Sequence, residues 1–208
     1  IGSLPATDSR EKWVDWGIRP PRGKQEQEIE FMGLPSSIVV LSMTREMDYN
    51  IRHNICLEAL KSILQTRCMN VIREKEGGTY AVNVNQGVVY EPVAQYSMIV
   101  EFQCDPLNAA KLKGIVYGEL ERLRQQVPSR DELMMALNSI RKKEGEARES
   151  NVYWQEKLVL YYRTGLNQAD VREFEEIVDK LTPEDFLEFV REFWENVDIT
   201  DVVFKPKS

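Results

Sequence analysis

A long apolar helix face, followed by two glycines and an alternating strand, most strongly limits what this chain can fold into. Small and aliphatic side chains recur at every fourth position of this face: Cys56, Leu60, Leu64, Cys68 and Ile72. The i, i+4 spacing predicts one helix from about Asn50 to Glu76, with its apolar side against a core. Gly77 ends this helix, and the residues from Tyr80 onward alternate in polarity as a half-buried strand does.

The corner between this helix and the next strand brings an arginine and a tyrosine together. Arg73 lies in the last predicted helical turn and Tyr80 at the predicted strand start, so both side chains can point at one place. A guanidinium and a phenol both donate hydrogen bonds, which suits a carbonyl oxygen that becomes negative during nucleophilic attack. A purely structural role is the alternative, because a cation favours a helix C-terminus and tyrosine favours strands.

The first half of the chain carries most of the strand patterns. Alternation or short apolar runs predict strands at 26–32, 37–43, 80–89 and 95–104, and a last strand at 199–204. The first four are expected to form a meander that the long helix interrupts once. This order predicts an α+β fold, with an antiparallel sheet and helices packed on one face. A doubly wound parallel sheet is not favoured, because regular strand–helix alternation and a glycine-rich phosphate loop are missing from the sequence.

Helix start signals dominate the second half. Asp105-Pro106 predicts an N-cap followed by a first-turn proline. Ser129–Glu132 matches a capping box and opens a long charged helix to about Arg163, which Gly145 can interrupt. Thr182–Asp185 starts a further helix with an apolar stripe that is expected in the core. The stripe consists of Phe186, Phe189, Val190 and Phe193.

Charge and reactive residues exclude several classes of function. A net charge of −7 without a basic block argues against nucleic acid or an anionic membrane as a partner. The 3 cysteines lack CxxC spacing, and two of them belong to the apolar helix face, so buried thiols are expected. His53 is the single histidine, whereas a zinc hydrolase site takes several imidazoles or carboxylates. We therefore expect no metal and no cofactor held by this chain itself.

A single domain is expected over residues 1–208. Residues 1–24 carry proline and glycine turn signals and predict an extended connector whose tryptophans cover a core edge, with the core at 25–208. The start Ile1–Pro5 has neither methionine nor signal-peptide character, which suggests a piece of a longer protein. No apolar run approaches the roughly 20 residues that span a bilayer.

Four segments, taken in order, carry a family resemblance. They are Ile1–Pro5, the helix and corner Leu60–Tyr80, the helix start Ser129–Leu133 and the later helix start Leu181–Phe186. Together they resemble the last domain of the insulinase/pitrilysin family of zinc metallopeptidases, the inverzincins. The corner is similar to the family's Arg-Glu-Lys-x-Gly-x-x-Tyr pattern, with Gly77-Gly78-Thr79 before the tyrosine. The family's zinc motif H-x-x-E-H lies in its first domain and is absent from this sequence.

The resemblance implies that the parent protein is a zinc-dependent endopeptidase whose zinc lies in an N-terminal half outside this chain. This chain would close the substrate chamber and would supply Arg73 and Tyr80, which would contact a peptide or protein substrate near the scissile bond. Alone, it would cleave nothing. The resemblance also favours the bacterial periplasm or cell envelope. One alternative is a non-catalytic half that only holds substrate or structure, and another is an unrelated α+β interaction module.

Overall fold

The computed structural model describes residues 14–31, 33, 35–76 and 81–207, without the side chains of residues 73–76. In chain order its elements are β1 (Lys24–Phe31), β2 (Ser37–Glu46), α1 (Ile51–Glu76), β3 (Val82–Val89), β4 (Gln95–Cys104), the 3₁₀ turn η1 (Pro106–Asn108), α2 (Ala109–Gln125), α3 (Arg130–Ala147), α4 (Asn151–Thr164), α5 (Val171–Lys180), α6 (Pro183–Trp194) and β5 (Asp198–Pro206). These strands and helices confirm the predicted α+β class.

The strands form one sheet of mixed direction, not the purely antiparallel sheet that the patterns predict. Within the described residues the strand order is β1-β5-β2-β4-β3. β2 pairs antiparallel with both β5 and β4, and β3 pairs antiparallel with β4. β1, however, runs parallel to β5, with Gln27 beside Val202. The predicted meander is wrong at this point, because the last strand of the chain lies between β1 and β2.

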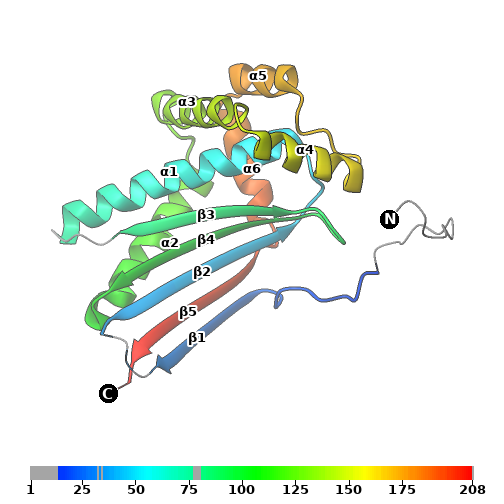
Figure 1. Cartoon of the computed structure of the whole chain (residues 1–208). Coiled ribbons are helices and arrows are strands. Elements are labelled where there is room, and N and C mark those ends of the chain that lie inside the picture. Colours follow the sequence, from blue (N-terminus) through cyan, green and yellow to red (C-terminus); the bar gives the residue numbers. More distant parts are fainter. Residues whose placement is uncertain (1–13, 32, 34, 77–80, 208) are drawn as a thin grey trace.

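Helices cover one face of the sheet and leave the other face open, as predicted (Figure 1). α1 and α2 lie against the sheet, α6 packs on both of them, and α3 and α5 pack on the side of α1 that faces away from the sheet. Every second residue is buried from Val39 to Met43 in β2 and from Tyr96 to Cys104 in β4. The core therefore lies between the sheet and the first helical layer. Among the described helices, none is long and apolar enough to cross a membrane.

α1 buries the apolar face that its sequence predicts. All members of the i, i+4 row are completely or almost completely inaccessible to solvent: Cys56, Leu60, Leu64, Cys68 and Ile72. Burial raises the pKa of the thiols of Cys56 and Cys68 to about 12. Both thiols therefore stay protonated at neutral pH and pack as small apolar side chains, as the cysteine spacing predicts.

One predicted helix is in fact two. The segment expected to run from Glu132 to Arg163 is divided into α3 and α4, and Gly145 lies within α3. The division follows from a new N-cap: the Ser150 hydroxyl accepts a hydrogen bond from the Val152 amide at 3.2 Å. Such a cap satisfies one of the amide groups that a helix start leaves unpaired. The helix α5 after it is an additional element that the patterns did not predict.

Of the two predicted capping boxes, the one at α6 forms completely and the one at α3 forms only in part. At α6 both halves form, because the Thr182 hydroxyl accepts from the Asp185 amide at 3.1 Å and the Asp185 carboxylate accepts from the Thr182 amide at 3.0 Å. At α3 the Ser129 hydroxyl accepts from the Glu132 amide at 3.2 Å. The Glu132 carboxylate instead accepts two hydrogen bonds from Arg67, both 2.7 Å long. This pair makes two charge-assisted bonds where the capping box would make one, and it ties α3 to α1.

A buried ion pair holds β5, the strand between β1 and β2, to α2. The Asp201 side chain is completely buried, and one of its carboxylate oxygens lies 2.9 Å from the Lys113 ammonium. The Tyr117 hydroxyl donates to the same carboxylate at 3.0 Å. Because a buried carboxylate is costly without partners, these two contacts favour the observed position of β5 over a shifted one. The position of β5 in turn decides where β1 pairs.

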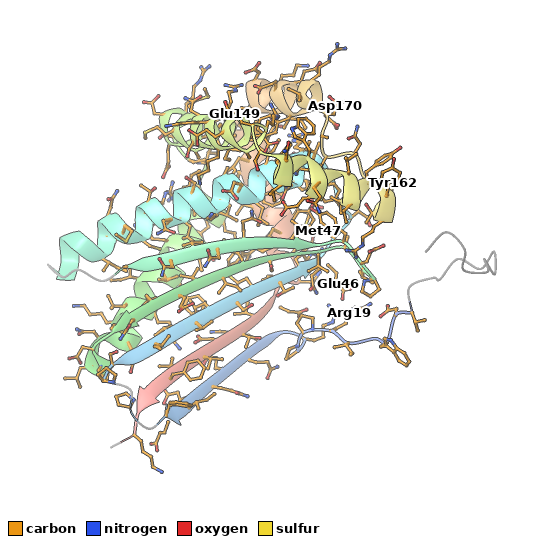
Figure 2. All side chains as sticks on the ribbon, in the orientation of Figure 1. Arg19, Glu46, Met47, Glu149, Tyr162 and Asp170 are labelled. Carbon is orange, nitrogen blue, oxygen red and sulfur yellow. The ribbon has the colours of Figure 1, made fainter. Side chains whose placement is uncertain are left out.

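The connector at the start of the chain differs from the prediction in one respect. Residues 14–23 contain no helix or strand, but the Trp16 side chain is 81% exposed, so it does not cover a core edge. Trp13 lies outside the described residues. An ion pair attaches this segment to the sheet instead: the Arg19 guanidinium lies 3.0 Å from the Glu46 carboxylate at the end of β2 (Figure 2).

Candidate functional site

The corner that carries the predicted Arg73–Tyr80 pair joins α1 to the edge strand of the sheet. α1 ends at Glu76, and β3, at one edge of the sheet, begins at Val82. Tyr80 and the side chain of Arg73 lie outside the described residues, so the geometry of the pair stays a prediction. The described segments on the two sides of the corner, the end of α1 and the start of β3, lie at the same end of the molecule (Figure 1).

Side chains of α1 hold both sides of this corner in place. The Gln65 carboxamide donates to the Val82 carbonyl at 2.6 Å and accepts from the Val84 amide at 2.9 Å. These bonds satisfy backbone groups of an edge strand that have no strand partner on that side. The Arg67–Glu132 pair fixes the same part of α1 to α3. A side chain that must contact a substrate accurately needs such a rigid support behind it.

The described residues do not assemble a metal site. Among them, no group of three or more His, Cys, Asp or Glu side chains is arranged to hold an ion. His53 packs near the start of α1, with its ring beside Phe189 and its Nε2 atom 3.6 Å from a carboxylate oxygen of Glu192. Desolvation lowers the pKa of His53, although the Glu192 charge acts in the opposite direction. Its surroundings are therefore those of a packed helix start.

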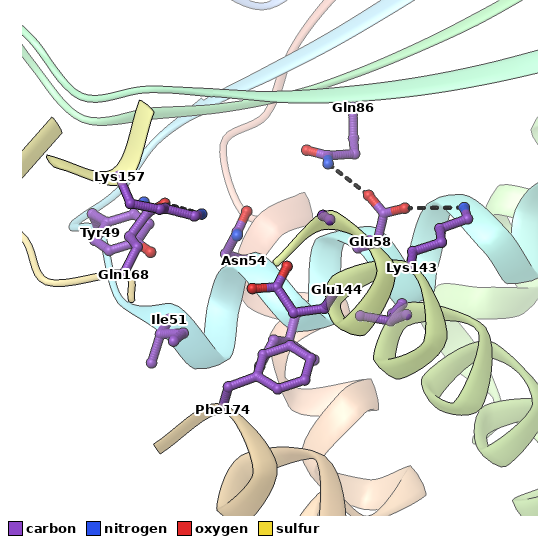
Figure 3. A pocket seen from close by; sticks show the side chains of 13 residues that line it. Tyr49, Ile51, Asn54, Glu58, Gln86, Lys143, Glu144, Lys157, Gln168 and Phe174 are labelled. Carbon is purple, nitrogen blue, oxygen red and sulfur yellow. Dashed lines mark hydrogen bonds and ion pairs between the residues drawn. The ribbon is translucent and has the colours of Figure 1, made fainter. Parts of the chain in front are cut away.

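A small cavity lies between α1, α3, α4 and α5, beside β3 (Figure 3). Its volume is about 260 Å³. Its walls combine apolar side chains, among them Ile51 and Phe174, with polar ones. Figure 3 shows Lys157, Asn54 and Glu144 pointing toward its interior from three different segments. None of these residues belongs to a sequence motif, because no local spacing connects them.

The carboxylates in this cavity already have partners. Glu58 accepts a hydrogen bond from the Gln86 side chain at 2.7 Å, and its other oxygen lies 3.8 Å from the Lys143 ammonium. Glu144 accepts from the Tyr153 hydroxyl, and Arg148 adds a charge 3.6 Å away. The negative charges on this side of the cavity are therefore balanced by the protein itself.

The direct contacts of the Lys157 ammonium are neutral groups, although the charges of Glu144 and Glu156 also act on it. The Lys157 ammonium donates to the Gln168 side-chain oxygen at 2.9 Å and lies 5.2 Å above the Tyr153 ring. The Gln168 amide in turn donates to the Tyr90 hydroxyl at 2.5 Å, which anchors this arrangement to the loop after β3. Desolvation lowers the pKa of Lys157 from its usual value. A positive charge is thus positioned at the cavity at a cost in solvation.

Comparison with known proteins places the chain in a family of peptidase domains. A family model described as the peptidase M16 inactive domain matches residues 1–140. A zinc protease PQQL-like protein of Arabidopsis thaliana is 22% identical over 121 residues, which are 56% of this chain and 13% of that protein.

Solved structures agree on the fold. The periplasmic protease PqqL from Escherichia coli superposes with a TM-score of 0.81 at 18% identity, covering 99% of this chain and 23% of that one. The ferredoxin protease FusC, solved with Arabidopsis ferredoxin, gives a TM-score of 0.72 at 14% identity, covering 90% of this chain and 21% of that one. The chain thus spans less than a quarter of each of these three relatives. Because the family model covers well over half of its residues, this chain belongs to the peptidase M16 inactive domain family, as the insulinase-type resemblance predicts.

Proposed function

We propose that this chain is the part of a zinc endopeptidase that closes the substrate chamber without holding the zinc. The family match carries the proposal, because the matching model describes an inactive domain of a peptidase. The name of one relative, a zinc protease, supports the same class of parent protein. The zinc would lie in an N-terminal half of the parent, since the described residues of this chain offer no ligand set that fits it.

In this proposal Arg73 and Tyr80 act directly on the substrate. Activated water would come from the zinc site in the other half. Tyr80 would donate its hydroxyl proton in a hydrogen bond to the scissile carbonyl oxygen as that oxygen becomes negative. Arg73 would hold the substrate backbone or orient Tyr80, because a guanidinium offers several donors in one plane. The Gln65 and Arg67 contacts support this function by holding α1 near the corner.

A peptide or protein is the expected substrate. FusC was solved in complex with ferredoxin, so a relative with the same fold binds a whole protein. The second expected partner is the rest of the parent protein, because this chain covers less than a quarter of the relatives it matches. That remaining part, including the N-terminal metallopeptidase half, would face this domain. Neither nucleic acid nor a membrane is part of the proposal, because the net charge of −7 opposes both.

A non-catalytic half is the second candidate, and the word "inactive" in the family description favours it. Such a half would hold substrate or structure while all chemistry took place elsewhere. The two candidates differ in their need for Arg73 and Tyr80, since a purely structural half has no use for both donors at one corner. Substitution of these residues in the parent protein therefore separates them.

Zinc analysis of the purified chain tests whether the zinc is held outside this chain. After dialysis we expect far less than one zinc per chain and no cleavage of an unfolded protein substrate, because one histidine and scattered carboxylates do not form a tetrahedral site. The control is the parent protein under the same conditions, for which we expect one zinc per molecule and measurable cleavage. Stoichiometric zinc held by ligands of this chain alone would contradict the proposal.

A further inference from the structure

We infer that the cavity between α1, α3, α4 and α5 binds a small monocarboxylate with an apolar body, and that Lys157 takes its carboxylate. This inference goes beyond the proposed peptidase role and does not depend on it, because none of the lining residues belongs to the Arg73–Tyr80 corner. Figure 3 shows the polar end of the site, where the Lys157 ammonium is directed toward Asn54.

Lys157 has unused hydrogen-bonding capacity. An ammonium has three N–H donors, and Lys157 gives one of them to Gln168 at 2.9 Å. None of the ion pairs formed between described residues includes Lys157. The half-buried charge has lost part of its hydration, which is the reason for its lowered pKa. An incoming anion would restore the lost interaction energy and form a charge-assisted hydrogen bond.

The charged groups that line the cavity decide the sign of the ligand charge. A cationic ligand would meet Glu58 and Glu144, but both already bind donors of the protein. It would also meet the Lys157 charge, which would repel it. A dicarboxylate would place its second charge near Glu144, which is directed into the same space (Figure 3). A single negative charge meets the fewest like charges here, because Glu144, whose charge also acts on Lys157, is partly balanced by Arg148 and by the Tyr153 hydroxyl.

The size and polarity of the remaining space limit the body of the ligand. About 260 Å³ is less than the roughly 300–1,000 Å³ of sites for drug-sized ligands, so the ligand is a small molecule or a single terminal residue. Ile51, Ile55 and Phe174 provide apolar surface, and the Asn54 carboxamide can bind an amide or hydroxyl group of the ligand. A branched aliphatic residue with a free carboxylate matches both properties.

Two sources share this chemistry, a free acid and the C-terminal residue of a peptide. The experiment titrates the 208-residue chain by isothermal calorimetry with N-acetyl-leucine and with acetyl-Ala-Ala-Leu. N-acetyl-leucinamide is the control ligand, since it differs from N-acetyl-leucine only in the missing charge. We expect binding of N-acetyl-leucine at about 1 mM or tighter and at least about tenfold weaker binding of the amide. Tighter binding of the tripeptide would assign the site to peptide ends, and equal binding would assign it to free acids.

Variants connect the binding to Lys157. Lys157→Gln keeps a hydrogen-bonding side chain without the charge and should weaken N-acetyl-leucine binding by at least about tenfold, whereas Lys157→Arg should retain most of it. The matched control is Lys142→Gln on α3, whose side chain is exposed and does not line the cavity. Equal affinity for the acid and the amide in the unsubstituted chain, no binding, or an unchanged affinity in Lys157→Gln would overturn the inference. The comparison of the two ligands decides the matter even if a variant fails to fold.

Discussion

In the full-length parent protein, Tyr80→Phe should lower kcat by about 10²–10³-fold with little change in KM. The substitution removes only the phenolic hydroxyl, and the loss of one donor to a developing oxyanion typically has this effect on turnover. KM stays nearly unchanged because the bond is made in the transition state and not in the ground state. Steady-state cleavage of a peptide substrate measures both constants. The unfolding midpoint should not change, since the ring remains in place.

Two further variants make this experiment decisive. Arg73→Ala should lower kcat and raise KM together, because a guanidinium can bind ground-state carbonyls as well as orient its neighbour. Tyr162→Phe is the matched control, since that tyrosine is 82% exposed on α4 and also loses only a hydroxyl. If Tyr80→Phe kept kcat within twofold of the wild type, a difference of about 0.4 kcal/mol, the catalytic role would be wrong. The structural interpretation of the corner would then hold.

Phe193→Ala should lower the free energy of unfolding by about 3–5 kcal/mol, the usual cost of removing a large buried side chain and leaving a cavity. Phe193 is completely buried on α6, where its ring stacks on Phe189 with centroids 6.2 Å apart and meets Trp194 edge-on at 5.9 Å. The loss is large beside a typical domain stability of about 5–15 kcal/mol. Urea denaturation followed by tryptophan fluorescence measures it, and Phe193→Leu should cost less.

The control for this prediction is Leu107→Ala in the 3₁₀ turn, because that side chain is 92% exposed. It should change the free energy of unfolding by no more than about 0.5 kcal/mol. A cost below about 1 kcal/mol for Phe193→Ala would mean that α6 does not pack into the core as described. An altered denaturant slope in either variant would instead show a change in the surface exposed on unfolding.

Local patterns predicted the helices and strands that depend on close neighbours in the sequence. The observed bounds of β4 agree with the predicted 95–104, and α1 begins at Ile51 and ends at Glu76, as its apolar face and the following glycine indicate. The Thr182 capping box starts α6 as predicted. These signals involve residues one to four positions apart, so the sequence displays them directly. The order of the same motifs also indicated the family, which the comparison confirms.

The same local rules failed to predict the partner of Glu132 and the end of α3. Glu132 stands where a capping box requires it, yet it binds Arg67, which is 65 positions away in the chain. Gly145 is a plausible helix breaker, but the cap at Ser150 decides the break instead. At Glu132 the packing of α3 on α1, which no spacing pattern contains, chose between two acceptable partners for the carboxylate. At Ser150 the signal is local, a hydroxyl that caps the Val152 amide two positions on.

By itself, then, the sequence determined the class of fold, the helix faces, the family and the Arg73–Tyr80 prediction, all of which depend on residue types at short spacing. The tertiary structure alone decided that β1 pairs parallel with β5 and that a cavity forms around Lys157. The Gln168–Tyr90 bond and the Lys113–Asp201 pair join residues 78 and 88 positions apart. The physical reason is that desolvation makes unpaired buried charges and backbone groups costly, and this cost acts only once distant segments meet.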